Sequence, residues 1–240
     1  MALAHPSESI QLFEQQAAEF AAFAPRSWTW RLVERPAFDF HLKDAYATAG
    51  RVLDLGCGSG RITELLARRS VLPRQITGVD GSERLLGIAR REQPDVAFVR
   101  QDIRCLDLPA RDFSLVTAHM VFQALPDYEL QATLRGAYEH MAPGGILFFI
   151  TTHPLRQIEG DASLYLKRRR IPITTPWDMS NVNFVRPVSD YVNYTASAGF
   201  RIDYVDELGV SEAVRAECPA RYARHAQFGA IRIAIKACKQ

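Results

Sequence analysis

The sequence Val52-Leu-Asp-Leu-Gly-Cys-Gly-Ser-Gly60 places a short apolar segment directly before three closely spaced glycines. A short apolar run that ends in glycines is typical of a buried strand followed by a sharp turn. After the turn, Ile62, Leu65 and Leu66 recur at helical spacing, so a helix is predicted over residues 59–69. Free N–H groups at the start of such a helix, next to flexible glycines, predict a ligand-binding turn.

The same alternation of apolar strands and helices continues along the chain. It predicts strands at 51–55, 75–79, 96–100, 113–118 and 145–151, with helices at 59–69, 82–92 and 128–141. Such alternation is typical of a parallel sheet covered by helices on both faces. A helix at 187–198 and a strand at 200–208 follow. The segment 231–236 alternates with period two, which predicts a closing strand exposed on one face.

The predicted elements outside this core suggest one domain with a lid. A helix is predicted over 7–23, with Ser7 as its N-cap, and another over 37–48. Residues 153–186 contain several prolines and no clear periodicity, which is typical of a functional loop. We therefore expect a single domain over 1–240. Its parts are an N-terminal helical cap (1–50), a cofactor-binding core (51–152), a substrate lid (153–186) and closing helix and strands (187–240).

Composition excludes several classes of protein. Lys and Arg total 29 against 27 Asp and Glu, and the resulting net charge of +2 predicts neither nucleic acid nor an anionic membrane as a partner. The four cysteines lie far apart without a CxxC pair, which disfavours a zinc knuckle or a redox dithiol. The acidic N-terminal segment lacks a secretory signal, so a cytoplasmic location is expected.

Three aspartates are predicted at the carboxyl ends of three consecutive strands, where open sheets bind ligands. Asp54 ends the first, Asp80 the second and Asp102 the third. A dinucleotide site would need glycine at position 61, which is Arg61, and Asp54 would oppose a pyrophosphate. The same carboxylate suits a ligand that carries an ammonium and a sulfonium. Singly, each aspartate could instead cap a helix.

With these residues in place, the chain closely resembles the class I S-adenosylmethionine-dependent methyltransferases. The resemblance covers about residues 51–152. It rests on Val52–Gly60, Gly78-Val-Asp-Gly-Ser82, Gln101-Asp-Ile103 and Met141-Ala-Pro-Gly-Gly-Ile-Leu147. It implies an α/β, Rossmann-like, seven-stranded mixed sheet with an antiparallel last strand. It also implies S-adenosylmethionine as cofactor and S-adenosylhomocysteine as product.

The resemblance also assigns cofactor contacts residue by residue. The glycine turn would face the methionine and ribose, the second strand end the ribose, and the third the adenine, while the end of the fourth strand would border the methyl group. The expected cofactor-binding residues are Asp54, Gly56, Cys57, Gly58, Asp80, Gly81, Asp102, Ile103 and His119.

The acceptor side of the predicted site is less defined. Ala118-His-Met-Val121 replaces the Pro-Pro-aromatic motif of amino-methylating nucleic-acid enzymes and lacks the aspartates of metal-dependent relatives, so no metal is expected. His153 and His119 are candidate general bases, and each could equally be a hydrogen-bonded histidine that stabilises a turn. Candidate substrate-binding rings, which could also be packing residues, are Trp28, Trp30, Trp177 and Phe184.

The leading hypothesis is methyl transfer to nitrogen or oxygen of a small planar, heteroaromatic metabolite, by in-line displacement that depends mainly on proximity. An azapteridine such as a toxoflavin precursor, a product of secondary metabolism, is one example. The alternatives are a protein or RNA methyltransferase and a non-catalytic S-adenosylmethionine-binding protein; an NAD-dependent oxidoreductase is disfavoured by Arg61 and Asp54. A monomer and a homodimer both remain open.

Overall fold

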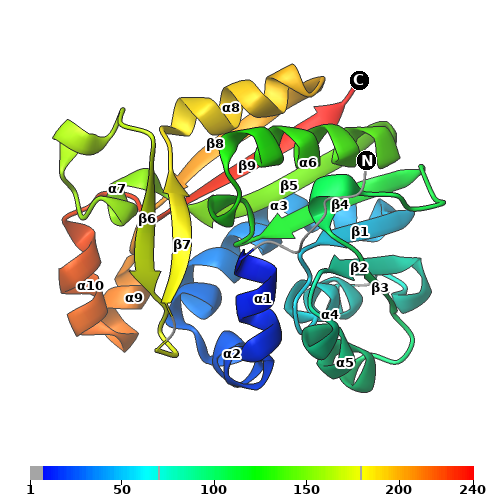
Figure 1. Cartoon of the computed structure of the whole chain (residues 1–240), viewed down its shortest axis with the longest axis horizontal. Helices are drawn as coiled ribbons and strands as arrows, with labels where there is room; N and C mark the ends of the chain where they lie inside the picture. The colour runs from blue at the N-terminus through cyan, green and yellow to red at the C-terminus, as the bar shows by residue number, and fades with distance from the viewer. Residues whose placement is uncertain (1–7, 70, 179) are drawn as a thin grey trace.

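A computed structural model of the protein describes residues 8–69, 71–178 and 180–240. Seven strands form one mixed sheet in the order β3-β2-β1-β4-β5-β9-β8 (Figure 1), and β9 runs antiparallel to both of its neighbours. The predicted seven-stranded α/β sheet with an antiparallel last strand is therefore confirmed. Its strands are β1 Arg51–Leu55, β2 Ile76–Asp80, β3 Ala97–Arg100, β4 Phe113–His119, β5 Met141–Thr152, β8 Phe200–Leu208 and β9 Arg232–Lys239.

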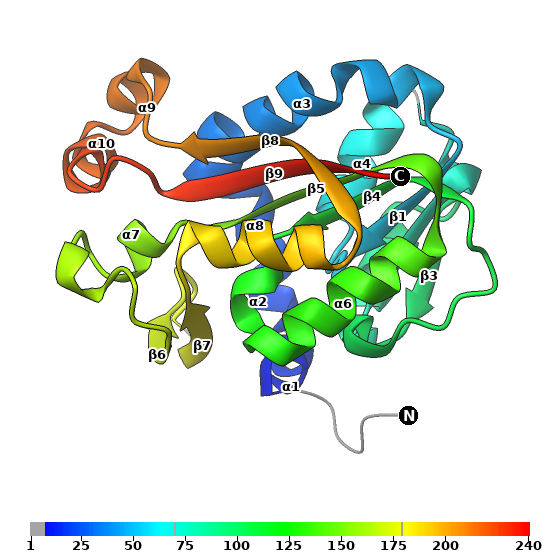
Figure 2. The same ribbon diagram turned by 90° about the horizontal axis from the view of Figure 1, so that it is seen from above.

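Helices cover both faces of the sheet (Figure 2). On β1, Val52 packs into the apolar cluster under α3 (Arg35–Thr48) and α4 (Arg61–Arg68). Leu53 and Leu55 point into the cluster under α6 (Asp127–His140) and α8 (Val188–Ser197) on the opposite face. Because both faces are buried, the central strands contain nearly continuous apolar residues rather than a polar–apolar alternation. Helix α5 (Glu83–Glu92) follows β2.

The remaining elements gather largely at the carboxyl edge of the sheet (Figures 1 and 2). They include a single turn of π-helix, η2 (Trp30–Glu34), a geometry that is frequent at functional sites. The other elements near this edge are α1 (Glu8–Gln15), α2 (Ala17–Phe23), α7 (Pro154–Gln157), the hairpin β6 (Arg169–Thr174) and β7 (Ser180–Val185), α9 (Glu212–Glu217) and α10 (Pro219–Ala226). Short 3-10 turns are η1 (Ala24–Arg26), η3 (Pro73–Gln75), η4 (Ile103–Cys105), η5 (Phe122–Ala124) and η6 (Ala162–Leu164).

Several expectations from the sequence need correction. The segment predicted as one helix over 7–23 forms two helices, and its proposed N-cap, Ser7, lies outside the described residues. The predicted lid contains α7 and a two-stranded hairpin, because β6 and β7 pair over six residues each. Strand β9 is not exposed on one face. Its polar residues Arg232 and Lys236 are covered by N-terminal segments, and Lys236 Nζ donates a hydrogen bond to the His41 carbonyl.

Across the described residues, no helix combines the length and apolar character that a bilayer span requires.

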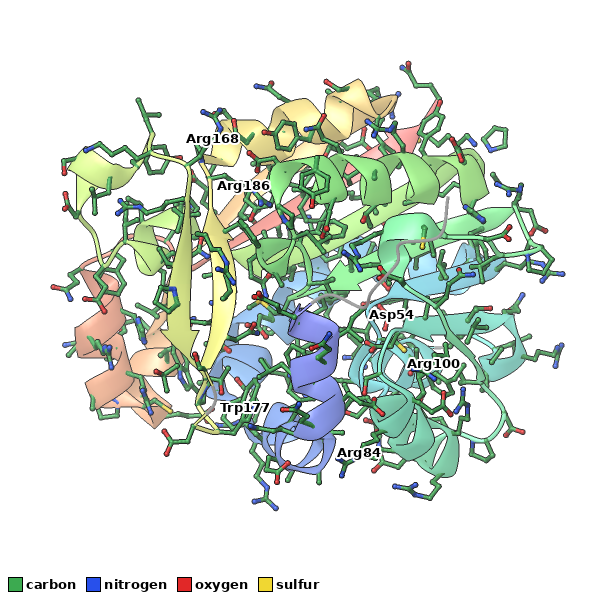
Figure 3. The ribbon with its side chains drawn as sticks, in the orientation of Figure 1. Asp54, Arg84, Arg100, Arg168, Trp177 and Arg186 are labelled. Atoms are coloured by element: carbon green, nitrogen blue, oxygen red, sulfur yellow. The ribbon has the colours of Figure 1, made fainter. Side chains whose placement is uncertain are left out.

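The hairpin is anchored to the sheet by a buried arginine. Arg186, which follows β7, is 1% exposed, and its guanidinium donates to the carbonyls of Phe122 and Leu125 in the turn after β4 (Figure 3). Its Nε lies 2.9 Å from Asp127 Oδ1. Removing a buried charge from such a network leaves its partners unpaired, which is costly.

We therefore expect Arg186→Met to lower the free energy of unfolding by about 3–5 kcal/mol in urea titrations. The matched control is Arg170→Met on the same hairpin, whose exposed side chain pairs with the exposed Glu8. A surface pair of this kind contributes about 0–1 kcal/mol. Equal losses in the two variants would contradict an anchoring role for Arg186.

Candidate cofactor and acceptor site

The glycine turn between β1 and α4 has the conformation that the sequence predicts. Gly56, Gly58 and Gly60 have φ values of 66°, 55° and 90°, a region that residues with a Cβ rarely adopt. A Cβ on Gly56 would also lie only 2.4 Å from Cγ2 of Val121. The turn is fixed to β2 because Cys57 N donates to the Val79 carbonyl over 3.0 Å. The backbone at this edge is therefore held where a ligand can approach it closely.

Asp54, at the end of β1, is buried with one unsatisfied oxygen (Figure 3). Its carboxyl is 1% exposed, and Oδ1 accepts a hydrogen bond of 2.8 Å from Thr117. Oδ2 has no hydrogen-bond partner. Burial raises the pKa of Asp54 to about 7, although the bond from Thr117 acts in the opposite direction. A buried carboxyl that can ionise near neutrality is suited to a cationic ligand group.

Asp80, at the end of β2, links the glycine turn, the start of α5 and, through Ser82, α1. Its Oδ2 accepts from Gly58 N at 2.9 Å, and its Oδ1 accepts from Ser82 N at 2.8 Å. Ser82 in turn caps α5 and donates from its hydroxyl to Glu14 of α1 at 2.6 Å. The carboxylate predicted to hold a ribose therefore shapes the glycine turn, and α1 is attached next to it.

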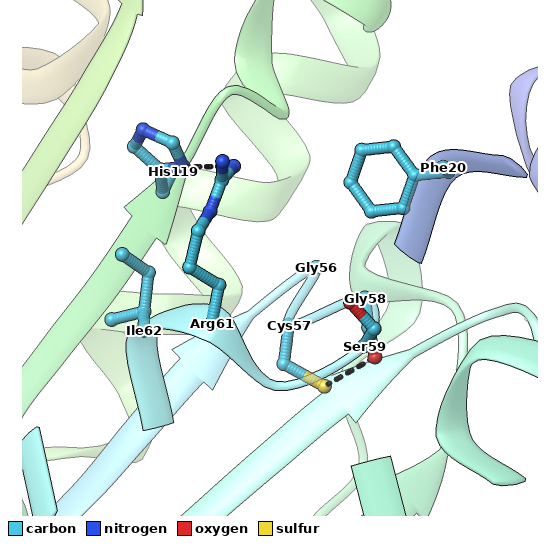
Figure 4. A pocket seen from close by; sticks show the side chains of 8 residues that line it. All are labelled: Phe20, Gly56, Cys57, Gly58, Ser59, Arg61, Ile62 and His119. Atoms are coloured by element: carbon cyan, nitrogen blue, oxygen red, sulfur yellow. Dashed lines mark hydrogen bonds between the residues drawn. The ribbon is translucent and has the colours of Figure 1, made fainter. Parts of the chain in front are cut away.

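A small cavity of about 30 Å³ lies over the glycine turn (Figure 4). Its lining residues are Phe20, Gly56, Cys57, Gly58, Ser59, Arg61, Ile62 and His119. Four of them were predicted as cofactor contacts. Phe20 and Arg61 were not assigned to the site. Phe20 lies in the segment 7–23, which the sequence predicts to be helical without indicating what it packs against, and Arg61 stands where a dinucleotide site needs glycine.

The other predicted cofactor residues lie around this cavity rather than in its lining. Gly81 lies against α1, since a Cβ there would be 2.6 Å from Cδ1 of Ile10. Asp102 is engaged by its neighbour, because both of its oxygens accept hydrogen bonds from the Arg104 guanidinium. Ile103, 8% exposed, begins the short turn η4.

The carboxyl groups of Asp54 and Asp80 and the backbone of the glycine turn fit a cationic nucleoside. Side chains of the protein, however, fill the space that such a ligand would occupy. Pockets for ligands of this size measure about 300–1,000 Å³. The cavity of about 30 Å³ is closed by Phe20 of α2, whose ring faces Gly58. Binding of a nucleoside therefore requires Phe20, on α2, to move away from the turn.

His119, at the end of β4, has both ring nitrogens occupied. Its Nδ1 lies 3.1 Å from Nη2 of Arg61, which can only donate, so Nδ1 is the acceptor. The proton therefore lies on Nε2, which donates to Oε2 of Glu34 at 3.0 Å. Burial and the adjacent Arg61 lower the pKa of His119 to about 4. In this arrangement the imidazole is neutral and has no free nitrogen to accept a proton.

His153, directly after β5, also has both ring nitrogens hydrogen-bonded. Its Nδ1 accepts from Leu155 N at 3.1 Å and caps α7, so its Nε2 carries the proton and donates to Glu207 at 2.7 Å. Burial lowers the pKa of His153 against the effect of Glu207. Of the two alternatives for this histidine, the geometry favours the one in which it stabilises a turn.

The predicted substrate-binding rings do not converge on one surface. Trp30 packs edge-on against His119 at 5.4 Å between centroids and lies under the Arg61 guanidinium. Trp177, at the tip of the hairpin, packs against rings of α1 and α2 (Figure 3). Trp28 stacks on His225, and Phe184 is half-buried in β7. Trp28, Trp30 and Trp177 thus already pack against other rings, and Trp30 and Trp177 each lie next to a cavity-lining residue, His119 and Phe20.

The described His, Cys, Asp and Glu side chains form no group of three that could hold a metal ion.

Comparison with known proteins shows which family this chain is similar to. Residues 52–145 match the family model described as "Methyltransferase domain". The trans-aconitate 2-methyltransferase of Variovorax paradoxus is 31% identical over 175 residues, which cover 70% of this chain and 64% of that protein. The ubiquinone biosynthesis O-methyltransferase of Coxiella burnetii is 35% identical over 104 residues, 42% of each chain. The chain thus matches less than two thirds of the length of these curated relatives.

A solved structure supports the fold over nearly the whole chain. The N-methyltransferase NodS from Bradyrhizobium japonicum, in complex with S-adenosyl-L-homocysteine, superimposes with a TM-score of 0.67 at 14% identity. The match covers 97% of this chain and 99% of that one. At this identity the likeness concerns the fold alone.

The pKa of Asp54 predicts how stability depends on pH. The folded state keeps the proton up to about pH 7, whereas an unfolded chain loses it near pH ~4. Relative to Asp54→Asn, the wild type should therefore lose stability as pH rises between about 4 and 7, by up to about 1.4 kcal/mol per pH unit. Urea unfolding across this range measures the difference.

The control for this experiment is Asp44→Asn, an exposed aspartate on α3. Because this side chain is exposed, the substitution should change the free energy of unfolding by no more than about 0.5 kcal/mol. An Asp54→Asn variant that stays parallel to the wild type would show that Asp54 does not titrate in this window.

Proposed function

The chain belongs to the class I S-adenosylmethionine-dependent methyltransferases, and on this basis we propose that it transfers a methyl group from S-adenosylmethionine to oxygen or nitrogen of a small-molecule acceptor. The observation that carries the proposal is the buried carboxyl of Asp54, whose Oδ2 has no partner beside the glycine turn. A cationic cofactor supplies a group that such a carboxyl can bind. The curated relatives named above are methyltransferases of small molecules, which supports a small acceptor.

In this proposal the residues at each strand end bind a different part of the cofactor. Asp54 faces the cationic methionine part, and the glycine turn allows close approach of the sulfur and ribose. Asp80 accepts from the ribose hydroxyls while it keeps its bonds to the backbone N–H groups of Gly58 and Ser82. Asp102 and Ile103 border the adenine, where the Asp102 carboxylate is held by Arg104.

The chain's own residues would contribute mainly alignment and exclusion of water. The cofactor supplies a methyl group on a positively charged sulfur, which is already activated for displacement. Transfer then requires the acceptor atom in line at contact distance, in a site closed to solvent. His119 lines the site at the end of β4 as a neutral side chain in a fixed position, since Arg61 and Glu34 form hydrogen bonds to both of its nitrogens. We propose that His119 and His153 are positioning residues rather than general bases.

The packing of the aromatic residues bears on the acceptor. A flat, heteroaromatic acceptor would need exposed ring faces, yet Trp28 and Trp177 are packed against other rings. The proposal therefore keeps a small acceptor methylated at oxygen or nitrogen and does not require a planar one. Methyl transfer to protein or RNA has no comparable support from the relatives named above.

Incubating the purified protein with S-adenosylmethionine and a panel of small carboxylic acids, phenols and amines should release S-adenosylhomocysteine with at least one acceptor. Asp80→Ala should weaken S-adenosylhomocysteine binding by about 1–3 kcal/mol in calorimetry, because a charged hydrogen-bond acceptor is lost. Asp44→Asn should leave this affinity unchanged. Tight binding without turnover of any acceptor would favour a non-catalytic binding protein, and stabilisation by NADH instead would contradict the cofactor assignment.

Movement of α2 predicts a fluorescence signal. Trp177 packs against Phe20 and Phe23 of α2, with ring centroids 5.3 and 5.2 Å apart. Opening of α2 should therefore change the environment of this indole when S-adenosylhomocysteine binds. The fluorescence change should be smaller in Trp177→Phe than in the wild type, and Trp28→Phe should keep the full change. An unchanged signal in Trp177→Phe would place the movement elsewhere.

A further inference from the structure

A chain of buried charges leads from the cofactor edge toward α7 and α10. Glu34 is 2% exposed, and its two oxygens accept from His119 Nε2 at 3.0 Å and from Arg232 Nε at 2.6 Å. Burial would raise the pKa of Glu34, but Arg232 and His119 outweigh it and hold the pKa well below its usual range. The negative charge of Glu34 is therefore already compensated by Arg232 and by the hydrogen bond from His119.

Arg156 lies beyond Arg232 and has no carboxylate partner among the described residues. It is half-buried on α7, which the His153 cap fixes to the end of β5. Burial and the nearby Arg232, with smaller contributions from Arg224 and Arg221, lower the pKa of Arg156 to about 9. Glu34 is the opposing carboxylate, and it is already paired. Positive charge therefore exceeds negative charge at this point.

Arg221 and Arg224 extend this excess along α10. Both are exposed, and within the described chain neither forms an ion pair. Together with Arg156 and Arg232 they define what we call the arginine cluster. Net repulsion within a partly buried cluster destabilises the fold unless a ligand or counter-ion offsets it.

An uncharged group beside the cluster has an unsatisfied hydrogen-bonding atom. His225 is 5% exposed, and its Nδ1 has no partner. Burial, then Arg156 and Arg224, lower the pKa of this histidine to about 4, so it is neutral at pH ~7. Buried polar atoms nearly always have partners, so Nδ1 of His225 is a second, independent indication of a ligand.

The cluster lies at the same edge of the sheet as the cofactor residues. Arg232 pairs with Thr152, the last residue of β5, and β5 lies beside β4, which ends at His119. Glu34 bonds to both His119 and Arg232 and so bridges the two regions. A ligand held by the cluster would therefore lie at the edge of the sheet that carries the cofactor residues.

We propose that the methyl acceptor is an oxyanion, a small molecule bearing carboxylate or phosphate groups, which the arginine cluster binds through Arg156. The inference rests on the proposed methyltransferase function and names its substrate class. A guanidinium binds either group through two parallel N–H···O bonds. An acceptor oxygen that is already ionised gives up no proton on methylation, which agrees with the absence of a free nitrogen on His119 and His153.

The test is calorimetric titration at constant ionic strength with citrate, inorganic phosphate and, as an uncharged probe, glycerol. Citrate or phosphate should bind the wild type, and Arg156→Gln should weaken that binding ten- to a hundredfold. The matched control is Arg135→Gln, an exposed arginine on α6 away from the cluster, which should bind like the wild type. The anion that depends on Arg156 identifies the chemical source, carboxylate or phosphate.

S-adenosylhomocysteine binding, measured on the same samples, separates the two proposals. It should be equal in the wild type and in Arg156→Gln, which also shows that the variant is folded. Three outcomes, each with intact S-adenosylhomocysteine binding, would overturn the anionic acceptor alone. They are no anion binding, equal anion binding by the wild type and Arg156→Gln, and binding of glycerol as tight as that of the anions. Failure of S-adenosylhomocysteine to bind the wild type would instead overturn the proposed function.

Discussion

A single buried carboxylate, Glu34, joins three segments that are distant in the sequence. It contacts His119 at the end of β4 and Arg232 at the start of β9 from a turn of π-helix in the N-terminal region. A carboxylate is stable in such a place only when its charge and hydrogen bonds are fully matched. Arg232 and His119 supply that match. Because Glu34 accepts from Nε2 of His119, Nδ1 is left to accept the hydrogen bond from Arg61.

The parallel core was predictable because its signals are local. Strand β1, the glycine turn and α4 follow one another within twenty residues, and each has a composition that suits only its own element. Strand β6 and the helices α9 and α10 are short and largely exposed, so they contain few buried apolar residues to mark them. The error at β9 has a different cause. Its polar residue Arg232 is buried and Lys236 is half-buried, because both bond to N-terminal segments that the sequence cannot place beside them.

The candidate site was predictable to the extent that the backbone defines it. The glycines and the aspartates at the strand ends are fixed by the sheet, and the cavity forms where they indicate. The side chains that close the cavity come from far away, as Phe20 does, and a single sequence does not show which helix covers a turn. Likewise, nothing in the sequence shows that His119 and His153 each have both nitrogens engaged, because their partners Glu34 and Glu207 lie on remote elements.

The bond between Glu34 and Arg232 spans 198 positions of the chain. During synthesis on the ribosome, Glu34 emerges long before Arg232 has been made, and until then its carboxylate remains hydrated. Contacts between such distant residues form late, after the local core has condensed. The wall of the site is therefore completed only when β9 is added to the sheet. A nascent chain can present the glycine turn but cannot hold His119 in its final place.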